Sequence, residues 1–189
     1  MTGKTHQILG ITAGISYFLY SQEPTYAPAT AGAVLVFGYF SALMPDIDQP
    51  AAKIWDAIPF GRTISRLPNA FLDHRNLSHS LLGFLIFGFL IYKLLSLFPD
   101  YWGINTQVIL AISLISYGSH LVADMLTVEG IPIFFPIQNM FGIPPHPVEG
   151  LRIMTGKWFE NAVLFPVINL ILLIIIITHW TSIHKILFR

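Results

Sequence analysis

Residues 106–125 read TQVILAISLISYGSHLVADM, and this stretch decides the fold. A helix of that length, at about 1.5 Å per residue, is roughly 30 Å long and matches the hydrocarbon core of a bilayer. We therefore expect the stretch to cross a membrane. It also carries His120 and Asp124 near its end. Ionisable groups inside a membrane segment are costly, so they indicate a functional site.

The overall composition supports a membrane protein. Of the 189 residues, 54% are hydrophobic and only 11% are charged, with 10 Lys and Arg balancing 10 Asp and Glu. Soluble domains carry about 25% charged residues, and disordered chains need a high net charge. The lack of a basic excess argues against nucleic-acid binding. The chain has no cysteine, which excludes disulfides and thiolate metal sites. Its length predicts one domain over residues 1–189.

Four further apolar segments flank this stretch, at residues 7–20, 29–44, 80–98 and 162–178. The first two are short for a bilayer, 80–98 is long enough, and 162–178 is the most lipid-like. The sequence thus predicts an all-α, polytopic membrane helix bundle with about five transmembrane helices. The first segment has two alternative interpretations: a cleavable signal peptide, or a helix that only dips into the interface of a four-helix protein. Gly10 and Gly14 form a GxxxG step that favours close helix packing.

Two long connections, 45–77 and 127–159, contain many prolines that exclude long regular helices. The first interleaves apolar and basic residues, which fits either a segment on the membrane surface or a loop with its own small core. With the N-terminus inside, the cytoplasmic side receives 7 of the 10 Lys and Arg residues. The positive-inside rule therefore predicts a cytoplasmic N-terminus and two cytoplasmic connections.

This orientation brings ionisable groups from every predicted helix to one face of the membrane. They are His6, Asp46, Asp48, His74, His79, His120, Asp124 and Glu160. His120 and Asp124 are four residues apart and share one helix face. Each group alone reads as a cap, a turn former or an interfacial residue, and Ser78 is the expected N-cap of the third helix. Together they exceed the three or four ligands that one divalent cation requires.

The order of these motifs resembles the YdjM-like family of inner-membrane, metal-dependent hydrolases. The matching pieces are Thr5-His6, MPDID at 44–48, HRNLSHS at 74–80, GSHLVAD at 118–124, Gly130, Thr155-Gly156-Lys157 and Glu160. The resemblance covers nearly the whole chain. It implies a membrane protein with a metal site that hydrolyses phospholipids or related phosphoesters.

The leading hypothesis assigns roles to nine side chains. The metal ligands are expected to be His6, Asp48, His74, His79, His120 and Asp124, with Asp46 or Glu160 as general base and Arg75 on the substrate phosphate. Zn²⁺ suits the imidazole share of this set, and Mn²⁺ or Mg²⁺ suits its carboxylates. One or two ions fit the number of ligands. Membrane lipid is the expected environment and substrate; no nucleic-acid partner and no particular oligomeric state is predicted.

Two other function classes stay open on the sequence alone. A cation transporter would use the same groups as a pathway and would need ionisable residues through the depth of the bilayer. A non-catalytic scaffold would use them only as a hydrogen-bonded polar cap.

Overall fold

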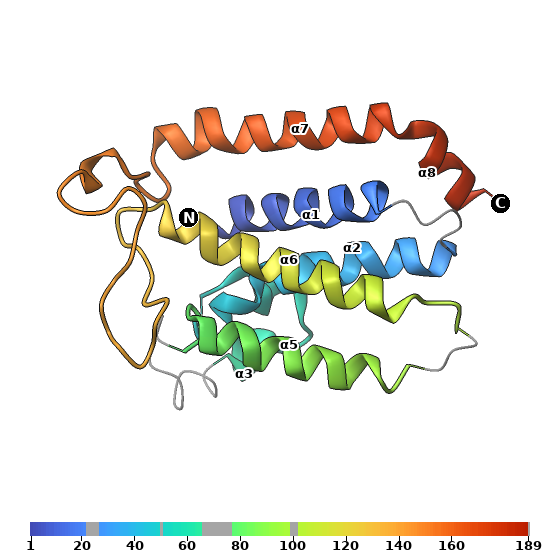
Figure 1. Cartoon of the computed structure of the whole chain (residues 1–189), viewed down its shortest axis with the longest axis horizontal. Coiled ribbons are helices and arrows are strands. Elements are labelled where there is room, and N and C mark those ends of the chain that lie inside the picture. Colours follow the sequence, from blue (N-terminus) through green and yellow to red (C-terminus); the bar gives the residue numbers. More distant parts are fainter. Residues whose placement is uncertain (22–26, 50, 66–76, 99–101, 189) are drawn as a thin grey trace.

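The computed structural model describes residues 1–21, 27–49, 51–65, 77–98 and 102–188, and these form an all-α bundle (Figure 1). The central helix is α6, Thr106–Met125, which contacts α1, Gly3–Tyr20, α2, Pro28–Leu43, and α5, Leu81–Leu95. The outer helix α7, Phe165–Thr178, packs on α1 and leads into the short α8, Trp180–Leu187. The described residues contain no β-strand beyond two isolated bridges.

Three helical stretches among the described residues are long and apolar enough to cross a membrane: Pro28–Asp48, Thr106–Met125 and Glu160–Thr178. The expected helix over 106–125 is confirmed at both ends. The second segment is longer than expected, because the 3₁₀ helix Met44–Asp48 extends α2.

The third segment is shorter than the sequence suggested. The expectation that 80–98 is long enough to span is wrong for the helix itself, since α5 has only 15 residues. Ser80 sets its start, because the Ser80 hydroxyl accepts a hydrogen bond from the backbone N–H of Gly83. The N-cap is thus Ser80 and not Ser78, which makes a different contact described below.

Small residues hold α1, α2 and α6 together at close range. A Cβ added to Gly10 would lie 2.3 Å from the Ala42 Cβ, and one added to Gly14 would lie 2.9 Å from a methyl group of Ile112. The Ser116 hydroxyl donates to the Gly10 carbonyl over 3.0 Å. The GxxxG step therefore packs as predicted, and it aligns the ends of the three helices that carry the ionisable groups.

Both long connections are folded where the structure describes them. In the first, the 3₁₀ helix Lys53–Ala57 buries Ile54 and Trp55 against Leu43, which favours the loop with its own apolar core. The second joins α6 to the π-helical turn Glu160–Leu164 that precedes α7. Its backbone bonds include the pair between Ile131 and Phe141.

Candidate metal centre

Five ionisable side chains meet at one end of the bundle. This is the end where α1 begins and α6 ends (Figure 1). They come from four elements far apart in the sequence: His6 from α1, Asp46 from the 3₁₀ helix after α2, His79 from the turn before α5, and His120 with Asp124 from α6. All are buried except Asp46, whose side chain is 16% exposed. The cluster thus has one side that solvent reaches.

Four of these side chains place their ligand atoms in a ring. The Nε2 atom of His79 lies 3.5 Å from Asp46 Oδ1 and 3.5 Å from Asp124 Oδ2. The Nε2 atom of His120 lies 3.8 Å and 3.5 Å from the same two oxygens. Zinc bonds of about 2.0–2.1 Å in tetrahedral geometry place neighbouring ligands roughly 3.3–3.4 Å apart. The four separations are therefore close to those between neighbouring metal ligands, and Asp46, His79 and His120 form one group of three that can hold a metal ion.

Hydrogen bonds on the far side of each imidazole direct Nε2 into this ring. His120 Nδ1 lies 2.7 Å from the Ala42 carbonyl oxygen, so it is protonated and donates. His79 Nδ1 lies 3.2 Å from the Ser78 hydroxyl, which itself donates to Asp48 Oδ2 over 3.2 Å. Among the described residues, neither Nε2 has a hydrogen-bond partner. Buried nitrogens without such a partner are rare, and here both point at two carboxylates.

His6 completes the cluster on its other side. The His6 imidazole stacks on the His120 imidazole, with centroids 3.5 Å apart and planes within 10°. The Nε2 atom of His6 lies 3.0 Å from Asp124 Oδ1, the carboxylate oxygen that does not face His79 and His120. The Met1 amino group contacts the same oxygen. His6, His120 and Asp124 thus form a second group of three that can hold a metal ion.

The charge of the cluster depends on His79. Burial lowers the pKa of His79, but the carboxylates of Asp124 and Asp46 outweigh burial and raise the pKa to about 9. At neutral pH the imidazolium therefore balances part of the negative charge of the two carboxylates. A divalent cation has to displace that proton to bind, which couples its affinity to pH.

Comparison with known proteins identifies the family of this chain. The family model of the YdjM inner membrane protein matches residues 1–186, which includes the whole cluster. The chain belongs to the YdjM inner membrane protein family. This confirms the resemblance drawn from the ordered motifs.

Three relatives of this YdjM family member extend the comparison. The uncharacterized protein YvsG of Bacillus subtilis strain 168 is 32% identical over 164 residues, which cover 87% of this chain and 88% of YvsG. The inner membrane proteins YdjM of Escherichia coli K12 and of Shigella flexneri are each 27% identical over 149 residues, covering 76% of this chain and 70% of the relative. No solved structure matches the chain significantly.

The structure of this family member separates the remaining candidate residues. Asp48 accepts a hydrogen bond from the Ser78 hydroxyl, which in turn contacts His79, whereas Asp46 is in the ring. Glu160 lies outside the ring and receives four hydrogen bonds, from the Thr2 backbone and hydroxyl, the Thr5 hydroxyl and the Gly156 backbone. His74 and Arg75 lie outside the described residues.

Sequence reasoning did not single out the groups that orient these side chains. The Ala42 carbonyl leaves no signal in a side-chain pattern. The Thr2 and Thr5 hydroxyls do leave one, because two threonines precede His6 at the start of an apolar run. Their pairing with Glu160, 155 or more residues later, follows only from the fold.

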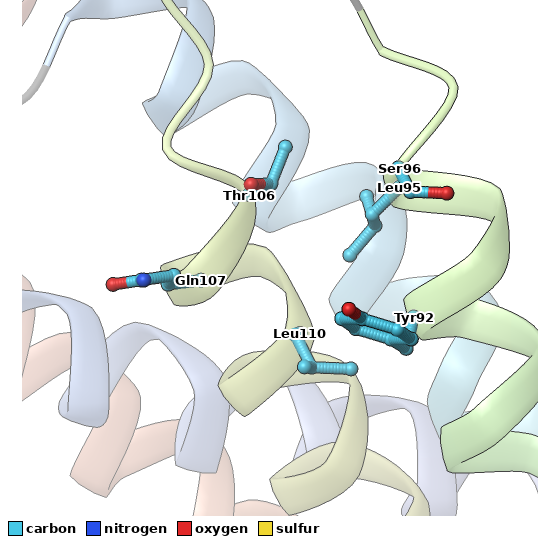
Figure 2. Close-up of a pocket in the computed structure, with 6 residues that line it drawn as sticks. All are labelled: Tyr92, Leu95, Ser96, Thr106, Gln107 and Leu110. Atoms are coloured by element: carbon cyan, nitrogen blue, oxygen red, sulfur yellow. The ribbon is translucent and has the colours of Figure 1, made fainter.

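A separate cleft lies at the opposite end of the bundle, between the end of α5 and the start of α6 (Figure 2). Its volume is about 240 Å³, and it is lined by Tyr92, Leu95, Ser96, Thr106, Gln107 and Leu110. None of these side chains is a carboxylate or an imidazole. The cleft is therefore no rival to the His/Asp cluster as a metal site.

Proposed function

We propose that this protein is a metal-dependent hydrolase of the inner membrane, acting on phospholipids or related phosphoesters at the cytoplasmic surface. The observation that carries the proposal is the ring of His79, His120, Asp46 and Asp124 ligand atoms. Its mixed donors suit Zn²⁺ best, with Mn²⁺ or Mg²⁺ as alternatives. One ion belongs in the ring; a second would bind at His6.

The chemistry divides between the cation and the chain. A bound cation would supply an acidified water and polarise a phosphoryl oxygen. His79 and His120 hold their Nε2 atoms in place through the bonds made by Nδ1. Asp46 is the cluster residue whose side chain solvent reaches. We therefore assign Asp46 as a ligand in the ring that also accepts the proton of an incoming water. Glu160 is saturated by its four donors, and we therefore assign it a structural role.

The depth of the cluster favours a lipid substrate. His120 and Asp124 lie 14 and 18 residues along α6 from Thr106, or about 21 and 27 Å at the helical rise. The hydrocarbon core is about 30 Å thick. The cluster thus lies near the boundary with the headgroups, where the ester and phosphate bonds of lipids are found. Arg75 remains our proposed contact for the phosphate.

The distribution of charge argues against a transport pathway. Between the cluster and the opposite end of the bundle, α1, α2, α6 and α7 carry no Asp, Glu, His, Lys or Arg. A cation that crossed the bilayer would lack ionised ligands along that route. The inner-membrane location and the cytoplasmic site are supported by the names of the two YdjM relatives and by the distribution of Lys and Arg.

The test is hydrolysis by the purified full chain in liposomes, with Zn²⁺, Mn²⁺ or Mg²⁺ added. Release of headgroup or fatty acid is expected from the wild type and not from His120→Ala or Asp124→Asn. His184→Ala, a histidine on α8 at the other end of the bundle, is the matched control and should keep full activity. If only soluble phosphoesters are cleaved, the lipid substrate is wrong; if metal-loaded protein cleaves neither, the hydrolase proposal is wrong.

A further inference from the structure

The segment 127–159, between α6 and the turn at Glu160, is fastened to the bundle close to the cluster. The Thr127 hydroxyl donates to the Asp124 carbonyl over 2.8 Å, and the Ile143 backbone N–H donates to the Met125 carbonyl over 2.7 Å. The Leu81 backbone N–H donates to the Ile133 carbonyl at the start of α5. The segment therefore has a fixed fold next to the residues that form the ring.

This segment turns most of its large apolar side chains outward. Leu151 is 79% exposed and Trp158 is 72% exposed. Six others are about half exposed or more, namely Phe134, Ile137, Met140, Ile143, Val148 and Met154. Ile131, by contrast, is fully buried. An ordered loop that exposes this much apolar surface is typical of an interaction site.

The charge of the segment bears on what kind of surface it can contact. Over its 33 residues it has only Glu129, Glu149, Arg152 and Lys157, which sum to zero. A charged protein or nucleic-acid partner would find no complementary patch. Both ends of the segment continue into candidate membrane spans, so the nearest apolar phase is the bilayer itself. Trp and other amphipathic side chains favour the boundary between headgroups and acyl chains.

We propose that segment 127–159 is a lipid-contacting platform whose exposed apolar side chains lie in the headgroup and acyl-chain boundary beside the cluster. Lipid contact by this segment requires no catalysis. Its role in presenting lipid phosphoesters to the ring rests on the proposed function. A platform of this kind would favour lipids over soluble esters as substrates.

Site-directed spin labelling tests this contact directly, because the native chain has no cysteine to remove. Met140→Cys, Leu151→Cys and Met154→Cys are labelled with a nitroxide in the full chain, reconstituted in phosphatidylcholine liposomes. His146→Cys is the control within the segment, since the His146 side chain is polar and 83% exposed. Leu173→Cys on the outer face of α7 is the bilayer reference.

At the three apolar positions, as at Leu173→Cys, we expect the nitroxide to collide more often with dissolved oxygen than with a water-soluble nickel complex. At His146→Cys we expect the reverse. If the nickel complex dominates at the three positions, the segment lies in water and the proposal is wrong. If both reagents are excluded, protein covers the segment, and the proposal is equally wrong. The readout needs neither metal nor activity, so its failure is separate from failure of the hydrolase proposal.

Discussion

Removing the Ser78 hydroxyl should weaken metal binding without removing any ligand. The hydroxyl bridges Asp48 Oδ2 and His79 Nδ1, each over 3.2 Å. In Ser78→Ala, the imidazole of His79 loses the contact that sets its tautomer and orientation. Asp48 loses the hydrogen bond that it accepts from Ser78 in the same step.

The distances set the size of the effect. Loss of a group that orients a metal ligand costs about 10–100-fold in metal affinity. Both bonds through Ser78 measure 3.2 Å, at or beyond the long end of the usual distances for imidazole N–H and hydroxyl donors. The loss of affinity should therefore fall at the lower end of that range of about 10–100-fold. We therefore expect about a tenfold loss for Ser78→Ala, or about 1.4 kcal/mol. His120→Ala, which removes a ligand, should cost far more.

Competition with a fluorescent chelator, using Zn²⁺ and the detergent-purified full chain, measures these affinities. Ser119→Ala is the matched control, because Ser119 also precedes a ring histidine but, within the described part of the chain, bonds only to the Ser116 carbonyl. Its affinity should be unchanged.

The double variant Asp48→Asn/Ser78→Ala decides how Asp48 acts. If Asp48 acts through Ser78, the double variant binds no more weakly than Ser78→Ala alone. Additive losses, or an Asp48→Asn loss as large as that of His120→Ala, would make Asp48 a direct ligand and refute its placement behind Ser78.

Three further outcomes follow from single features. Gly10→Ala should destabilise the bundle by about 1–3 kcal/mol in thermal unfolding, because the added Cβ would lie 2.3 Å from the Ala42 Cβ. Gly32→Ala should not destabilise the bundle, because nothing lies within 4 Å of a Cβ added there. Equal melting of the two variants would contradict this packing. Glu160→Gln should cost about 1–3 kcal/mol in the same assay. The amide NH₂ cannot accept a hydrogen bond, so even with the amide oxygen in the place of Oε1 the Gly156 backbone N–H loses its acceptor. An unchanged melt would show that this contact contributes nothing. Zn²⁺ affinity should rise about tenfold per pH unit between about pH 6 and pH 8, because the cation displaces the proton that His79 holds below its pKa of about 9. A Zn²⁺ affinity that does not change with pH would refute that protonation state.

The sequence was most informative where one physical constraint acts alone. The bilayer thickness fixes the length of the helix at 106–125, and both of its ends were predicted correctly. The same reasoning failed for 80–98, because the end of α5 depends on local capping and turn geometry rather than on hydropathy. The 3₁₀ extension of α2 likewise depends on Pro45 and the turn that follows, and not on apolar length.

For the site, the sequence predicted the residue types and the end of the bundle at which they gather, but not their individual contacts. Asp46 and Asp48 are two residues apart and chemically identical, so spacing could not decide which one faces the ring. In the structure, the 3₁₀ turn directs Asp46 toward the histidines and Asp48 toward Ser78. The stacking of His6 on His120 depends on the close approach of α1 and α6, which only the packed bundle defines.

The central claim is that the His/Asp ring binds a divalent cation, and one measurement addresses it most directly. It is an anomalous difference map from crystals of the full chain, recorded at the absorption edge of the metal found in the purified protein. We predict a peak about 2 Å from Nε2 of His79 and His120 and from the facing oxygens of Asp46 and Asp124. A stoichiometric metal bound elsewhere, or a ring without a peak in protein supplied with Zn²⁺, would contradict it.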